Sequence, residues 1–182
     1  MIYFTMELWK VLLISFFIIS VFGTLFHFTH DWFKKGILVH IFSAVNESTW
    51  EHMKLLLAPT LIAMVFQFFV FKGAYFNFWN AVLCLLVVEL IAMPLLFEPL
   101  RLIMKKVPLW LTIVIFFLSI VIGIFIEYLV LTKEFLLFGE VIAMVLVVVI
   151  ILLFAVFSYY PPKFFIFKDP ISGKYGDYTH KD

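Results

Sequence analysis

The chain has 182 residues, of which 65% are hydrophobic and 14% charged, and its formal net charge is +1. A soluble domain is about 45–50% apolar and about 25% charged, and so short a chain has too small an interior to hide the excess. The composition therefore excludes a soluble enzyme, a disordered tail and a secreted disulfide scaffold, and it favours a lipid bilayer. The small net charge predicts no nucleic-acid partner, and the single cysteine, Cys84, permits no internal disulfide.

Five apolar runs are each long enough to cross a bilayer, whose core of about 30 Å needs about 20 helical residues. They cover approximately residues 8–28, 49–71, 78–97, 111–131 and 135–160. Lipid offers no partners for backbone N–H and C=O groups, and the runs lack the alternation of barrel strands, so helix is the expected form. We predict an all-α integral membrane bundle of five transmembrane helices over residues 1–160 and a cytoplasmic tail over 161–182.

The first run ends in the stretch HFTHD, which holds His27, His30 and Asp31. No clean cleavage site follows it, so we predict a retained helix rather than a signal peptide. If the helix continues through this stretch, the three side chains share one face. Imidazole and carboxylate groups suit zinc and similar divalent metals. The alternative is that the two histidines simply reach from the membrane interface to water.

The loop that follows contains GILVHIFSAV, an apolar segment too short to span the membrane. We predict a short interfacial or re-entrant piece there. After it, NESTWEH (residues 46–52) starts the second span. Ser48 and Glu51 have the spacing of a capping box, in which each side chain bonds the backbone N–H of the other residue. That structural role leaves Asn46, Glu47 and His52 unexplained, and of these we take Glu47 and His52 as the candidate catalytic residues.

The segment VNESTWEHMKLL resembles the signature of a family of small, uncharacterised prokaryotic membrane proteins, whose pattern is close to VNESxWEHxKL. The pattern corresponds here to residues 45–55, and a family tail similar to FKDPxxGxYG corresponds to residues 167–176. The resemblance spans nearly the whole chain. It implies a shared fold and a shared site, but no activity.

Ionisable residues inside a membrane are functional candidates by default. Glu89 lies near the middle of the third span and Gln67 lies in the second. We expect Glu89 to be protonated or bonded to Gln67, Asn80 or Ser119, and Glu127 to reach the nearer membrane edge. A structural hydrogen bond between helices and a proton or ion relay are both open interpretations of Glu89.

The tail begins with Pro161 and Pro162, which end the fifth helix. It still carries several aromatic residues, and we predict that it folds back near the first loop. Ten of the 13 Lys and Arg residues fall on the side of that loop and the tail, while Lys10, Lys72 and Lys133 fall on the other. Positive residues favour the cytoplasm, so we predict a multi-pass protein of the cell membrane with its N-terminus outside and its C-terminus inside.

These residues suggest three possible functions. The first is a metal-assisted enzyme at the cytoplasmic interface, in which His27, His30, Asp31 and His52 hold a divalent metal such as zinc. Glu47 then acts as base, with His52 beside it, on a membrane lipid or other amphiphile. The second is a small transporter or channel subunit that uses Glu89 and Gln67 and works as a homo-oligomer or with a partner membrane subunit. A non-catalytic accessory role is the third possibility.

Overall fold

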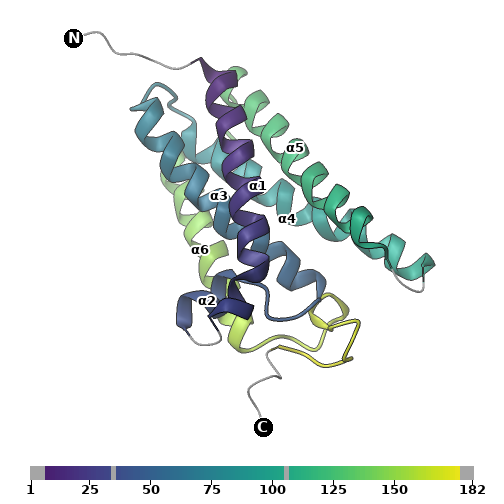
Figure 1. Ribbon diagram of the computed structural model, residues 1–182. Helices are drawn as coiled ribbons and strands as arrows, with labels where there is room; N and C mark the ends of the chain where they lie inside the picture. The colour runs from purple at the N-terminus through teal and green to yellow at the C-terminus, as the bar shows by residue number, and fades with distance from the viewer. Residues whose placement is uncertain (1–6, 34–35, 105–106, 177–182) are drawn as a thin grey trace.

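The computed structural model describes residues 7–33, 36–104 and 107–176, without the side chains of His30 and Asp31. Within these ranges the fold is all-α, as predicted (Figure 1). The helices are α1 (Leu8–Trp32), α2 (Ile37–Phe42), α3 (Thr49–Phe71), α4 (Phe78–Ile103), α5 (Leu109–Thr132) and α6 (Glu140–Tyr159). All of them except α2 are long and apolar enough to cross a membrane, which gives five candidate spans. The short α2 accounts for the segment predicted to be interfacial or re-entrant.

The largest departures from the predicted spans are at the end of α4 and the start of α6, and α1 also continues to Trp32 rather than ending at residue 28. α4 continues to Ile103, well beyond residue 97, with Pro94 and Pro99 inside it. Proline is tolerated within membrane helices because neighbouring groups satisfy the backbone carbonyls that it frees. α6 begins at Glu140 rather than at residue 135. The cause is Asn80, whose Oδ1 accepts the N–H groups of residues 137 and 138, each at 2.9 Å, and thereby holds this apolar stretch as a loop.

The helix α4 is the centre of the bundle, because it packs against α3, α5 and α6. α1 packs against α3 and α5, and the short α2 contacts α1, α3 and α6. A glycine on α5 permits the closest approach to α4, since a Cβ atom at Gly123 would lie 2.6 Å from Cγ of Glu89. The outward faces of α5 and α6 carry exposed apolar residues such as Phe125 and Val141, as expected for surfaces that meet lipid.

One end of the bundle is covered, and we call it the rim. It consists of α2, the N-terminal turn of α3, the C-terminal turns of α1, α4 and α6, and the tail; α1 begins at the opposite end (Figure 1). The tail folds back onto the rim, as predicted. Trp50 of α3 lies between the rings of Phe154 and Phe167, at centroid distances of 4.1 and 4.4 Å. Asn46 also donates a hydrogen bond to the carbonyl of Gly176 at 3.1 Å.

Candidate functional site

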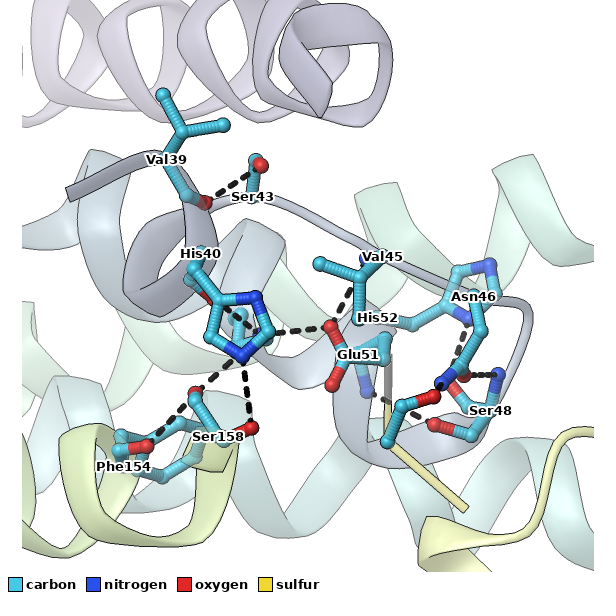
Figure 2. Close-up of polar contacts among 12 residues, drawn as sticks. Val39, His40, Ser43, Val45, Asn46, Ser48, Glu51, His52, Phe154 and Ser158 are labelled. Carbon is cyan, nitrogen blue, oxygen red and sulfur yellow. Dashed lines mark hydrogen bonds and ion pairs between the residues drawn. The ribbon is translucent and has the colours of Figure 1, made fainter. Parts of the chain in front are cut away.

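The segment NESTWEH forms the loop and first turn that open α3. Ser48 is the N-cap, and its side chain accepts the N–H of Glu51 at 3.4 Å. The predicted return bond is wrong, because Asn46 rather than Glu51 accepts the N–H of Ser48, at 2.8 Å. Asparagine readily bonds the backbone two residues on, so it occupies that donor first. The Glu51 carboxylate instead accepts the N–H of Val45 at 3.0 Å (Figure 2).

Glu51 forms a buried ion pair that the sequence reasoning missed. Nζ of Lys54 lies 2.6 Å from Oε2 of Glu51, and the two side chains are 0% and 4% exposed. Lys54 also donates to the carbonyl of His40 at 2.9 Å and to Oγ of Ser158 at 3.3 Å. These three acceptors match the three N–H donors of an ammonium group, so Lys54 ties α2 and α6 to α3. The i, i+3 spacing of Glu51 and Lys54 was the available sequence signal.

A second contact joins the same rim elements. The His40 ring donates through Nε2 to the carbonyl of Ser158 at 2.9 Å, beside the ion pair (Figure 2). The hydroxyl of Ser158 in turn donates to the carbonyl of Phe154 at 2.8 Å. His40 therefore acts in the packing of α2 on α6.

The remaining structural positions of the motif join α3 to α4 and to the tail. The Thr49 hydroxyl donates to the carboxylate of Glu98 on α4, which also pairs with Arg101 at 3.2 Å. Trp50 holds the tail through the ring stacking described above. Asn46, Ser48, Thr49, Trp50 and Glu51 therefore each make a contact that builds the rim.

Glu47 and His52 face each other. Nε2 of His52 lies 3.6 Å from Oε2 of Glu47, while Nδ1 lies 2.9 Å from the carbonyl oxygen of Ser48. A carbonyl can only accept, so Nδ1 carries the proton in that bond, and Nε2 of a neutral ring presents its lone pair toward Glu47. The His52 side chain is 10% exposed and that of Glu47 is 47% exposed. The pair thus connects a nearly buried imidazole to the surface of the rim.

His27 of α1 approaches the same imidazole. The ring centroids of His27 and His52 are 6.0 Å apart, and Phe97 of α4 lies on His52 at 6.1 Å. The structure therefore brings together His27, Glu47 and His52 from α1, the loop and α3. The ends of α1 and α3 therefore lie next to each other at the rim.

The predicted metal set included His30 and Asp31 with His27 and His52. His30 and Asp31 lie in the last turns of α1, and their side chains are outside the described part of the chain. Among the side chains that are described, no group of three or more His, Cys, Asp or Glu residues forms a candidate metal site. The described residues give metal binding no support, and the set of four ligands stays a prediction.

An apolar groove opens beside this cluster. Its volume is about 390 Å³, and its wall comes from α1, α2 and α3 through Phe26, Phe42, Ala58, Leu61, Ile62 and Val65. Phe26 directly precedes His27 in α1. The groove therefore runs from the end of α1 beside His27 toward the middle of α3.

Comparison with known proteins assigns the chain to a family. The model of a family of unknown function (DUF6512) matches residues 2–177. The chain belongs to this family. No curated protein and no solved structure matches it. The match covers every helix and the folded part of the tail, so the rim, the groove and the membrane interior all lie within the family region.

The two intramembrane candidates, Glu89 and Gln67, have partners other than those expected. Oε2 of Glu89 accepts the hydroxyl of Thr60 at 2.6 Å, whereas Gln67, Asn80 and Ser119 were the expected partners. Nε2 of Gln67 donates to Oγ of Ser15 on α1 at 3.0 Å.

Glu127 also departs from expectation. It is 0% exposed instead of reaching the membrane edge, because its part of α5 packs against α4 inside the bundle.

Proposed function

We propose that the rim is the active site of an enzyme that acts on a membrane lipid or another amphiphile. The observation that carries the proposal is the convergence of His27, Glu47 and His52 from three separate segments at the helix ends. The neighbouring motif residues are engaged in holding the rim together, and these three side chains remain next to one another. An acid–base pair supported by a fixed scaffold is the usual arrangement of a catalytic site.

In this proposal His52 is the general base. Its Nδ1–H is held by the carbonyl of Ser48, which fixes both the tautomer and the direction of Nε2. Nε2 takes a proton from a hydroxyl group or a water molecule, and the Glu47 carboxylate stabilises the imidazolium that forms. His27 supplies a second imidazole, whose ring centroid lies 6.0 Å from that of His52.

The groove supports an amphiphilic substrate. Its apolar wall, which includes Phe26, Phe42 and Ile62, suits an acyl chain or another long hydrocarbon group. The polar cluster adjoins the groove where Phe26 precedes His27, at the rim, and there a headgroup remains near water. A substrate held in this way reaches the site from the plane of the membrane.

A metal-assisted form of the same enzyme would use a divalent ion such as zinc. His27 and His52 would supply two ligands, and His30 and Asp31 the remaining ones. The ion would lower the pKa of a bound water molecule and so supply a nucleophile at neutral pH. Glu47 would then be the base that receives the proton.

The test is a lipid-turnover assay on the full chain in vesicles of phosphatidylethanolamine and phosphatidylglycerol. We expect mass spectrometry to show that the wild type alters the headgroup or acyl chains, and that His52→Ala and Glu47→Gln slow this by about 10²- to 10⁴-fold. His40→Gln is the matched control, because a glutamine amide can also donate to Ser158 and His40 lies outside the pair. No turnover by the wild type, or undiminished turnover by His52→Ala, contradicts the proposal. Full turnover without stoichiometric metal contradicts only the metal-assisted form.

A further inference from the structure

Polar residues from α1, α3, α4 and α5 meet inside the membrane part of the bundle, away from the rim. They are Ser15, Gln67, Glu89 and Glu127, and each is 0% exposed. Glu127 lies one turn after Gly123 on the face of α5 that packs against the Glu89 side chain, and the Gln67 amide is the polar neighbour of Glu127. Gly123 leaves room for the Glu89 side chain against α5. We call these four residues and Thr60 the interior cluster.

The interior cluster has more hydrogen-bond acceptors than donors. The Thr60 hydroxyl bonds Glu89, the Gln67 amide N–H bonds Ser15, and the Ser15 hydroxyl bonds the carbonyl of Val11. The buried oxygen atoms left without a donor are Oε1 of Gln67, Oε1 of Glu89, and both Oε1 and Oε2 of Glu127. A buried polar atom without a partner costs free energy. Because all of the unpaired atoms are acceptors, the missing group must be a donor or a cation.

No basic side chain of the described residues fills this role. In the described part of the chain no basic side chain pairs with either carboxyl, because Oε2 of Glu89 accepts from Thr60 and the other three oxygen atoms of Glu89 and Glu127 have no partner. Ionised carboxylates at this depth would be two unpaired like charges in a medium of low dielectric constant, which is strongly unfavourable.

We propose that Glu89 and Glu127, with Gln67, form a proton-binding site in the interior of the membrane. One proton on each carboxyl removes both charges and adds two O–H donors. These O–H groups supply the donors that the interior cluster lacks. A single monovalent metal ion would leave one negative charge uncompensated, so protons fit the cluster better than sodium does.

The site is independent of the rim chemistry. Glu89 and Glu98 of α4 are separated by about 13 Å along the helix axis, from the rise of about 1.5 Å per residue. Between the rim contact of Thr49 and the interior contact of Thr60, the same face of α3 carries the apolar residues Met53 and Leu56. The proposal therefore stands or fails separately from the enzyme proposal.

The experiment is infrared spectroscopy of the full chain in lipid nanodiscs, which detects the C=O stretch of a protonated carboxyl group. We expect this band at neutral pH in the wild type, a loss of part of it in Glu89→Gln and in Glu127→Gln, and loss of nearly all of it in the double variant. Replacing potassium chloride by sodium chloride at constant pH should leave the band unchanged.

Glu140 is the matched control for these variants. It is an α6 carboxylate whose oxygens already accept the N–H groups of Trp79 and Asn80 at 2.8 and 3.0 Å and the Asn80 amide at 2.6 Å. Glu140→Gln should therefore retain the band. Absence of the band from the wild type, its equal loss in Glu140→Gln, or its removal by sodium overturns the proposal. The wild-type spectrum alone decides the matter if a variant fails to fold.

Discussion

At the residue scale, the rim depends on a buried ion pair. Lys54 and Glu51 lie out of water, so each relies on the other for charge compensation. Because Lys54 also bonds the carbonyl of His40 and the hydroxyl of Ser158, its loss would leave acceptors unpaired on α2 and α6. The Glu51–Lys54 ion pair therefore holds the structure around Glu47 and His52 in place, although neither Glu51 nor Lys54 belongs to the proposed catalytic pair.

Lys54→Met should destabilise the protein strongly. We expect a loss of about 3–5 kcal/mol in the free energy of unfolding, because Glu51 would remain as an uncompensated buried charge. The double variant Glu51→Gln/Lys54→Met should recover part of this loss, since no charge is then buried. Equilibrium unfolding of the purified protein in mixed micelles measures both values. Lys133→Met, at an exposed position after α5, is the control and should change stability little. Equal stability of Lys54→Met and Lys133→Met would contradict the structural role given to the ion pair.

At the element scale, the sequence predicted the helices better than their connections. Apolar runs of spanning length specify membrane helices almost alone, because lipid permits few other backbone forms. The late start of α6 depended on one side chain from another helix, Asn80, which no local pattern reveals. In the site, local spacing identified Glu47 and His52 by elimination. The partner of Glu89, Thr60, comes from another helix and for that reason could not be inferred from spacing, whereas the ion pair of Glu51 with Lys54 could have been.

The tail is the element whose docking can be tested most directly. Phe167 is 6% exposed and stacks on Trp50, whereas Phe165 in the same short helical turn is 50% exposed. Phe167→Ala should weaken docking by about 3 kcal/mol, as for other buried phenylalanines. Limited proteolysis between residues 161 and 176 should then be faster, because cleavage follows the population of the undocked tail. Phe165→Ala should be cut at the wild-type rate, and similar rates for the two variants would contradict docking through Phe167.

At the scale of the whole molecule, the charged groups separate into two ends around an apolar middle. The rim holds the Glu51–Lys54 and Glu98–Arg101 pairs, and Glu140 with Asn80 marks the opposite end. Between them lie the exposed apolar faces of α5 and α6 and the enclosed interior cluster. A membrane requires this division of any bundle that spans it. Because the number of candidate spans is odd, the start of α1 and the tail lie on opposite sides.

The direction in which the chain inserts into the membrane is predicted from the distribution of its positive charges. Lys54 is buried in its ion pair and should not count as a flanking charge, yet nine Lys and Arg residues still belong to the rim side, against three on the other. Positive residues near the spans favour the cytoplasm, so the rim and the proposed active site should face inward. A green fluorescent protein fused after residue 182 should therefore fluoresce, and alkaline phosphatase fused there should be inactive.

Replacing Lys34, Lys35, Lys105 and Lys106 by glutamine should weaken this charge bias and yield a mixed population of the two orientations in the same reporter pair. An active phosphatase at the C-terminus of the unaltered chain would show the opposite insertion, and the substrate of the rim would then have to come from the outer leaflet.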